Sequence, residues 1–266
     1  MKDTKIDWCD STWNPVTGCL HDCEYCYARG IANRYNGGCG EGGIYELDEP
    51  IRFFSTDDKT GKTIVGKAEP YPYGFEPTLY RYRLDQPKKW HEPRTIFVCS
   101  MGDLFGEWVE YSWIKEVFRA CENAPQHRYL FLTKNPARYF HLNKLGLLPN
   151  KPNFHYGVTI DTVKRADEWS KLVYIHDPLF KTFASVEPIL ERFDYGTCVN
   201  LCADTNWVIV GAESGYRIGR VVPAKGWIDD LARAAEVCKK PIFMKESPRT
   251  IMGDDFKQQY PWRAKA

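Results

Sequence analysis

The chain lacks the features of a membrane or exported protein. No apolar run is long enough to span a bilayer, and the opening Met-Lys-Asp-Thr-Lys is polar, unlike a secretory leader. An excess of charge is also missing, because 36 Lys and Arg face 35 Asp and Glu. The overall charge therefore gives no argument for a nucleic-acid partner, although a local groove can still be basic. We expect a cytoplasmic protein without membrane contact.

Disulfides are not expected either, although the chain has ten cysteines. Without an export signal these residues are interpreted as reduced thiols, some of them metal ligands and others packed in the core. Three stand close together in the spacing Cys19-x-x-x-Cys23-x-x-Cys26. Three thiolates on one short loop can hold three irons of a [4Fe–4S] cluster and leave the fourth iron open to a small molecule. We therefore predict these three residues to be metal ligands.

The alternative is a structural zinc site. Such sites usually combine two ligand pairs of short internal spacing, and this chain has no second Cys-x-x-Cys and no His-x-x-x-His pair. Three ligands would need a fourth, for which the candidates are His21, Cys9 and Cys39. The pair Cys198 and Cys202 is too small a set for a second cluster, so the roles of these two residues, of Cys9 and of Cys39 stay open.

From residue 94 onward, short apolar runs alternate with segments of helical periodicity, which is typical of repeated βα units and a parallel sheet. We predict strands over 95–101, 129–133, 154–160, 182–187, 207–211 and 241–245, a short N-terminal strand, and a helix near 25–35. Apolar residues at helical spacing predict further helices near 113–121, 163–172 and 228–238. The expected fold is α/β, an incomplete (βα) barrel of six or seven mainly parallel strands forming one domain over 1–266.

Residues 36–93 interrupt this alternation. They are rich in Gly, Pro, aromatic and charged residues and show no sustained periodicity. We interpret them as an irregular insertion that covers one end of the barrel. Within it, Arg81 and Arg83 are candidate contacts to a polyanionic substrate; the alternative is a solvated surface flap with ordinary basic residues.

Working residues of βα folds lie at the carboxyl ends of the strands. After the first long strand, Gly102 allows a ligand to approach the backbone and Asp103 can accept from an ammonium group or cap the following helix. After the next strand, Lys134 can neutralise a carboxylate. Ser185 and Glu187 end a later strand, and the cost of burying this glutamate calls for a partner, either substrate or Arg192 or Arg217.

The last two strand ends also carry candidates. Gly211 and the nearby Glu213 and Ser214 follow an apolar run, and small residues there allow close approach by a flat ring. Lys245 and Glu246 end the final strand, where they either face substrate or form a salt bridge at the sheet edge.

The cysteine loop resembles the cluster-binding loop of the radical S-adenosylmethionine (SAM) superfamily, in which the residue before the third cysteine is commonly aromatic, as Tyr25 is here. Further segments narrow the resemblance to the phage-associated three-Cys-motif family, a radical-SAM-like group of unassigned function. These segments are Trp13-Asn-Pro-Val-Thr-Gly18, Ser100-Met-Gly-Asp-Leu-Phe105, Phe131-Leu-Thr-Lys134, Ser185-Val-Glu-Pro188 and Val208-Ile-Val-Gly-Ala-Glu-Ser-Gly215.

The resemblance implies particular cofactor contacts. Tyr25 would lie beside the cofactor, and Met101-Gly102-Asp103 stands where the superfamily has a Gly-Gly-Glu that contacts the methionine amine of SAM. The shorter Asp103 is a departure from that pattern. Gly211 would line the adenine, with Ala212 in place of a usual second glycine.

The resemblance also implies the function. The protein would be a radical SAM enzyme that cleaves SAM reductively at a [4Fe–4S] cluster and abstracts hydrogen from an unidentified substrate, such as a nucleotide or nucleic acid base. An electron donor protein would supply the electron. The alternative is a non-catalytic zinc or iron–sulfur module that scaffolds a partner protein.

Overall fold

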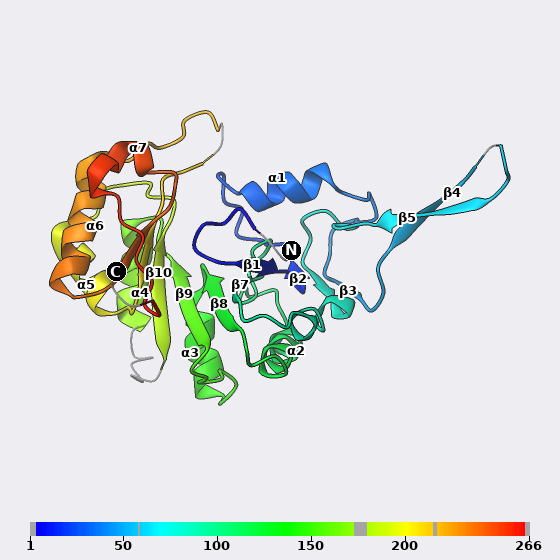
Figure 1. Ribbon diagram of the computed structural model, residues 1–266, viewed down its shortest axis with the longest axis horizontal. Coiled ribbons are helices and arrows are strands. Elements are labelled where there is room, and N and C mark those ends of the chain that lie inside the picture. Colours follow the sequence, from blue (N-terminus) through cyan, green and yellow to red (C-terminus); the bar gives the residue numbers. More distant parts are fainter. Residues whose placement is uncertain (1–3, 58, 173–179, 215–216, 264–266) are drawn as a thin grey trace.

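A curved sheet of seven strands, all paired in parallel, organises the molecule (Figure 1). The computed structural model describes residues 4–57, 59–172, 180–214 and 217–263. The strand order in the sheet is β1-β7-β8-β9-β10-β11-β12, so neighbours in space are successive along the chain after β7. The strands are β1 (Ser11–Trp13), β7 (Thr95–Val98), β8 (Arg128–Thr133), β9 (Phe154–Thr159), β10 (Lys181–Val186), β11 (Val208–Val210) and β12 (Ile242–Met244).

One helix follows each strand from β7 to β11 and covers the outer side of the sheet (Figure 1). These helices are α2 (Tyr111–Glu122), α3 (Pro136–Lys144), α4 (Val163–Leu172), α5 (Tyr195–Ala203) and α6 (Lys225–Val237), and the short α7 (Arg249–Met252) follows β12. In α2, the apolar residues at helical spacing are the ones buried against the sheet. The predicted α/β fold, an incomplete barrel of parallel strands, is confirmed. Within the described residues, no helix has both the length and the apolar character needed to cross a bilayer.

Aromatic side chains fill the inner side of the sheet. Trp8, from the N-terminal segment, packs there against Phe97, Phe183 and Trp207, with ring centroids 4.6, 6.2 and 6.3 Å away. Large rings bury more apolar area than any other side chain and so close this side of the half-barrel efficiently. The carboxyl ends of the strands are left as the place where a ligand can enter.

Some predicted boundaries differ from the structure. The first long strand was expected over 95–101, but β7 ends at Val98 because Cys99 has a φ of +57°. A strand cannot continue through a left-handed residue. Residues 99–103 therefore form a loop at the carboxyl end of the sheet, although Cys99 itself stays buried.

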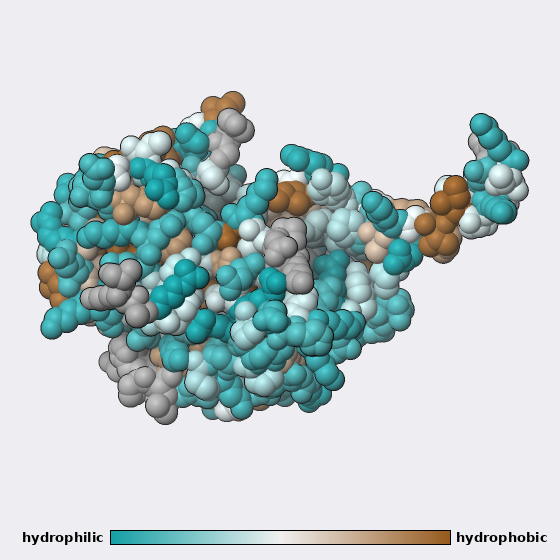
Figure 2. Space-filling model, viewed as in Figure 1, coloured by the Kyte–Doolittle hydropathy of each residue, from teal (hydrophilic) through white to brown (hydrophobic). Residues whose placement is uncertain are grey.

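The segment 36–93, expected to be irregular, contains short strands. β3 (Tyr45–Leu47) and β6 (Thr78–Tyr80) join β2 (Val16–Thr17) in a small sheet of order β2-β6-β3. β4 (Arg52–Thr56) and β5 (Thr63–Ala68) form an antiparallel hairpin. This hairpin projects away from the body of the molecule and does not cover the barrel (Figures 1 and 2). Periodicity missed the hairpin because neither of its faces is buried, so the sequence need not alternate.

Candidate active site

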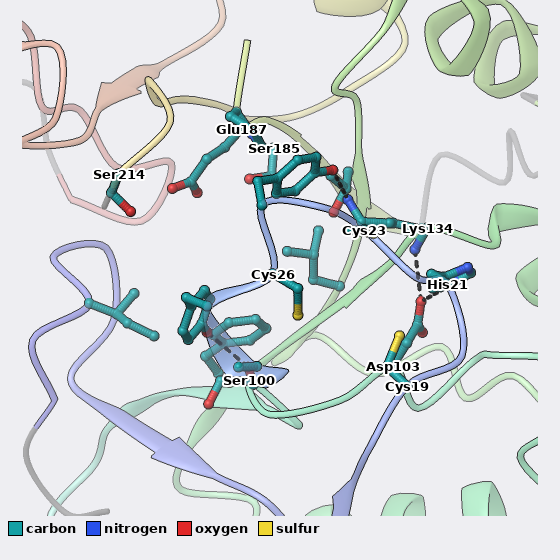
Figure 3. A pocket seen from close by; sticks show the side chains of 18 of the residues that line it. Cys19, His21, Cys23, Cys26, Ser100, Asp103, Lys134, Ser185, Glu187 and Ser214 are labelled. Atoms are coloured by element: carbon teal, nitrogen blue, oxygen red, sulfur yellow. Dashed lines mark hydrogen bonds and ion pairs between the residues drawn. The ribbon is translucent and has the colours of Figure 1, made fainter. Parts of the chain in front are cut away.

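A cavity of ≈490 Å³ opens at the carboxyl ends of the strands, between them and the loop that leads into α1 (Tyr27–Arg34) (Figure 3). This volume lies in the usual range for small-molecule sites. The polar lining comes from the cysteine loop and from the exits of β7 to β12, and the floor is apolar, with Trp8, Phe97 and Leu132. The structure thus brings one loop and six strand ends to a single site.

Cys19, Cys23 and Cys26 all line this cavity. Burial raises the pKa of Cys19 to about 12 and also raises that of Cys23 above its ordinary value. Cys26 is the N-cap of α1, where its Sγ accepts a hydrogen bond from the backbone N–H of Arg29 at 3.4 Å. A helix N-terminus favours negative charge. A bound metal would hold Cys19 and Cys23 in the thiolate form that ligation requires.

Two glycines fix the start of the cysteine loop. Gly18 has a φ of +85° and donates its N–H to the carbonyl of Met101 at 2.9 Å. A Cβ on Gly102 would lie 2.7 Å from the carbonyl oxygen of Gly18. The missing side chain of Gly102 therefore lets the start of the cysteine loop pack against the backbone after β7. Its contact with SAM stays a prediction.

Asp103 joins the cysteine loop to β8. One carboxylate oxygen accepts from His21 Nε2 at 2.8 Å, from Thr133 Oγ1 at 3.0 Å and from the backbone N–H of Lys134 at 2.9 Å. The other accepts from the N–H of Phe105 at 3.0 Å. Burial alone would raise the pKa of Asp103, but these bonds and the His21 ring lower it. Both oxygens are thus used within the protein, and the contact of Asp103 with SAM stays a prediction.

Tyr25 and Lys134 meet at a carboxylate that the sequence analysis missed. Lys134 Nζ lies 2.7 Å from the Tyr25 hydroxyl and 3.3 Å from Asp161, to which Tyr25 also donates. Arg165 pairs with the other oxygen of Asp161 at 2.7 Å. Burial would raise the pKa of Asp161, yet Lys134, Tyr25 and Arg165 together lower it. Asp161 directly follows the predicted strand 154–160, so inspecting that strand exit would have found it.

Ser185 lines the cavity from the end of β10 and Glu187 from just after it (Figure 3). Glu187 forms an ion pair with Lys245, which follows β12. The expectation that Arg192 or Arg217 would be the structural partner of Glu187 is wrong, because the partner is Lys245. Gly211 makes room for this pair: a Cβ there would lie 3.0 Å from Glu187 Cγ and 3.1 Å from Lys245 Cδ. Gly211 is therefore needed because a larger residue would collide with the Glu187–Lys245 pair.

Glu213 and Ser214 line the cavity after β11. Glu213 is buried and binds Arg217 through contacts of 2.6 and 2.8 Å, and it also accepts from the N–H of Val221 at 3.2 Å. The Arg217 hydrogen bonds lower the pKa of Glu213 against the opposing effect of burial. Arg217 reaches Glu24 of the cysteine loop at 3.3 Å, so these ion pairs link two sides of the cavity.

Arg81, a predicted substrate contact, lies outside the cavity lining. Its guanidinium faces three carboxylates, those of Glu46 at 2.7 Å, Glu116 at 3.1 Å and Asp48 at 3.4 Å. These pairs join the insertion to α2 and use the donors that a polyanion would need. A substrate contact by Arg81 stays a prediction.

Arg83 and Glu246 also lie outside the cavity lining. The Arg83 guanidinium stacks on Tyr80 at 3.6 Å from the ring centroid. Glu246 pairs with Arg249 through contacts of 2.6 and 2.7 Å. Of the four predicted substrate contacts, only Lys245 is in the cavity.

The donor set suits a cluster better than a closed zinc site. Among the described residues, no three His, Cys, Asp or Glu side chains are arranged to hold a single metal ion. The expected zinc ligands are placed elsewhere: His21 Nε2 is bonded to Asp103, the Cys9 thiol faces the carbonyl of Ile6, and Cys39 is exposed. Three thiols that share the wall of one cavity match a cluster with one open iron.

Two of the remaining cysteines belong to the core. Cys198 and Cys202 lie on α5 and are buried in the hydrophobic cluster between the sheet and the helices. Burial raises the pKa of both to about 12. The sequence left open whether Cys198 and Cys202 bind a second cluster. Their place in the core explains both residues by packing.

Comparison with solved structures identifies the fold. A spore photoproduct lyase mutant with a dinucleoside spore photoproduct has a TM-score of 0.55 and 12% identity, covering 88% of this chain and 75% of that chain. Another mutant form, with bound AdoMet (SAM) and the dinucleoside, has a TM-score of 0.53 and 12% identity, covering 90% and 78%. At this identity the likeness shows the fold alone, a half-barrel of parallel strands.

Among curated proteins, none matches the chain. A family described as "Protein of unknown function (DUF5131)" matches residues 3–253. That description does not support the phage association that the sequence resemblance implied. Since the match covers nearly the whole sequence, the chain belongs to the DUF5131 family of proteins of unknown function.

Proposed function

We propose that this protein is a radical SAM enzyme that uses a [4Fe–4S] cluster held by Cys19, Cys23 and Cys26. The observation that carries the proposal is the meeting of these three thiols at one cavity, at the carboxyl ends of a parallel half-barrel. When bound, the cluster would supply the electron that cleaves SAM to methionine and a 5′-deoxyadenosyl radical. An electron donor protein would provide that electron.

The chain's own residues would bind and orient SAM. Lys134 can neutralise the methionine carboxylate, because Asp161 and Tyr25 hold its ammonium group at the cavity wall. Gly102 and Asp103 fix the cysteine loop beside it. Ser185 is available for hydrogen bonds to the ribose, since no hydrogen bond of its hydroxyl within the chain competes in the described contacts.

The other end of the cavity would hold the adenine and the substrate. Ala212 and Ser214 line the cavity after Gly211, and small residues there would let a flat ring approach closely. Glu187 and Lys245 present one charge of each sign and can bind polar groups of either kind. The apolar floor of Trp8, Phe97 and Leu132 offers few hydrogen-bond partners to water and would help to shield a reactive radical.

The substrate we propose is a nucleotide or nucleic acid base. Support comes from the fold neighbour, which was solved with both AdoMet and a dinucleoside spore photoproduct. A cavity that accommodates SAM beside a nucleobase is thus compatible with this kind of half-barrel.

Anaerobic reconstitution with iron and sulfide tests the enzyme proposal. The wild-type protein is expected to bind about four irons and, once reduced, to convert SAM to 5′-deoxyadenosine. Cys23→Ala should abolish this conversion, whereas Cys39→Ala, which removes an exposed thiol outside the cavity, should leave it unchanged. Tight zinc binding without sulfide or SAM cleavage would contradict the proposal and favour a non-catalytic scaffold module.

A further inference from the structure

Helix α1 exposes a row of large side chains beside the cavity. Its buried side consists of the small residues Ala28 and Ala32. Tyr27, Ile31 and Tyr35 follow one another at intervals of four and are exposed. Residues four apart share one helical face, so these three form a row along the solvent side. The row begins at the cavity, because Tyr27 is one of its lining residues.

The β4–β5 hairpin carries a second set of exposed apolar side chains. Phe53, Phe54, Ile64 and Val65 are between 49% and 68% exposed. Phe54 pairs with Val65, so these two share one face, while Ile64 pairs with Ser55 on the other face. Figure 2 shows an apolar patch on the hairpin and a smaller one on α1, with hydrophilic surface between them.

A free two-stranded hairpin is at best marginally stable in water. Apolar side chains on both of its faces add nothing to the core, since the hairpin stands clear of the body (Figure 1). Exposed apolar groups that contribute no folding energy mark interaction sites. The hairpin is therefore best explained by a partner that it contacts.

Basic residues are interspersed among these side chains. Residues 27–36 and 52–68 carry six Arg and Lys but only Asp57 and Asp58, in a chain whose net charge is +1. Asp57 is occupied within the hairpin turn, where it accepts from the N–H groups of Lys59 and Thr60. Arg29 pairs with Asp22. The basic residues are Arg29, Arg34, Arg52, Lys59, Lys62 and Lys67.

We propose that α1 and the β4–β5 hairpin form a binding surface for a single strand of nucleic acid. Bases would stack on Tyr27, Tyr35, Phe53 and Phe54, and the Lys and Arg side chains would contact phosphates. This combination of aromatic platforms and basic groups is how proteins bind unpaired strands. A protein partner fits less well, because the cores of protein interfaces are depleted of charged residues.

The position of the surface also suggests its purpose. Since the row of rings starts at Tyr27, a strand bound there would place one of its bases at the cavity mouth. This last step rests on the proposed function. Strand binding itself does not, because it uses residues outside the cysteine loop.

Fluorescence anisotropy with labelled strands of about 20 nucleotides, one of DNA and one of RNA, tests the proposal at about 50 mM salt. The Phe53→Ala/Phe54→Ala variant of the full chain should bind about tenfold or more weakly. Leu145→Ala and Val237→Ala, which remove equally exposed apolar side chains elsewhere, should bind like wild type. Lys62→Gln/Lys67→Gln should reduce the slope of log affinity against log salt by about 1.4.

The outcomes separate this inference from the enzyme proposal. Cys23→Ala should keep strand binding while losing SAM cleavage. The inference would be overturned, whatever the SAM result, if the wild-type protein bound no strand. It would also be overturned if the Phe53→Ala/Phe54→Ala and Lys62→Gln/Lys67→Gln variants both bound the strand as tightly as wild type. Sedimentation that shows self-association of wild type but not of the Phe variant would also overturn it, by assigning the surface to a second copy of the chain.

Discussion

Replacing Asp103 by asparagine should destabilise the protein strongly although the two side chains have the same shape. The buried carboxylate accepts from three donors on one oxygen and from Phe105 on the other. Asparagine has one acceptor oxygen and brings two N–H groups against existing donors. In the better orientation of the amide, its oxygen keeps the three donors, and two buried N–H groups are left unpaired: that of Phe105 and the asparagine N–H that faces it. Each buried donor left unpaired costs about 1–3 kcal/mol, so these two predict a loss of about 3 kcal/mol in the free energy of unfolding.

Urea denaturation measures this loss as a lower midpoint at unchanged slope. Asp22→Asn is the matched control, because Asp22 is an exposed carboxylate on the same loop and pairs with Arg29. We expect the control to change stability by less than about 0.5 kcal/mol. The Asp103 variant should also bind less iron, since the carboxylate charge that holds His21 is lost. A loss below about 1 kcal/mol for Asp103→Asn would refute the view that this carboxylate holds the cysteine loop to the sheet.

Three further predictions concern residues in and around the cavity wall. Gly211→Ala should weaken SAM binding in calorimetry, because the added Cβ meets Glu187 at 3.0 Å and displaces its ion pair. Asp161→Asn should raise the KM for SAM more than it lowers kcat, because Lys134 loses the charge that positions it. The pKa of Glu213 is lowered in the folded protein, so this carboxylate stabilises the wild type above its unfolded pKa of about 4.3, and that stability is lost as pH falls. Glu213→Gln should therefore make the free energy of unfolding depend less steeply on pH in the acid range.

Each of these has a contradicting result, and the glycine variant also has a matched control. Gly226→Ala, at a helical site with open space around it, should leave SAM binding unchanged, and equal binding by Gly211→Ala would contradict the packing argument. An unchanged KM for Asp161→Asn would show that Lys134 does not bind the methionine carboxylate. If the free energy of unfolding of Glu213→Gln fell with pH in parallel with that of wild type, the Glu213–Arg217 ion pair would not contribute to stability.

The strong periodicity after residue 94 is why the fold could be predicted. Helix α2 and strand β9 follow the sequence pattern closely, because both bury their apolar residues in one core. The hairpin could not be predicted in this way, since it is exposed on both faces. Patterns of burial carry no information about an element that buries nothing.

The site was predictable to the extent that it lies at strand ends. Lys134 and Glu187 were found from that rule, and the same rule applied to β9 would have found Asp161. Partners were harder: the pairing of Glu187 with Lys245 joins positions 58 residues apart and depends on the register of three neighbouring strands. Arg81 looked free in the sequence because its three carboxylate partners are scattered along the chain.

The most direct test of the central claim is electron paramagnetic resonance of the reconstituted, reduced protein with and without SAM. The account predicts the signal of a reduced [4Fe–4S] cluster that changes shape when SAM is added, because SAM binds the iron that lacks a cysteine. A signal that SAM leaves unchanged, or protein that holds zinc and no sulfide, would contradict it.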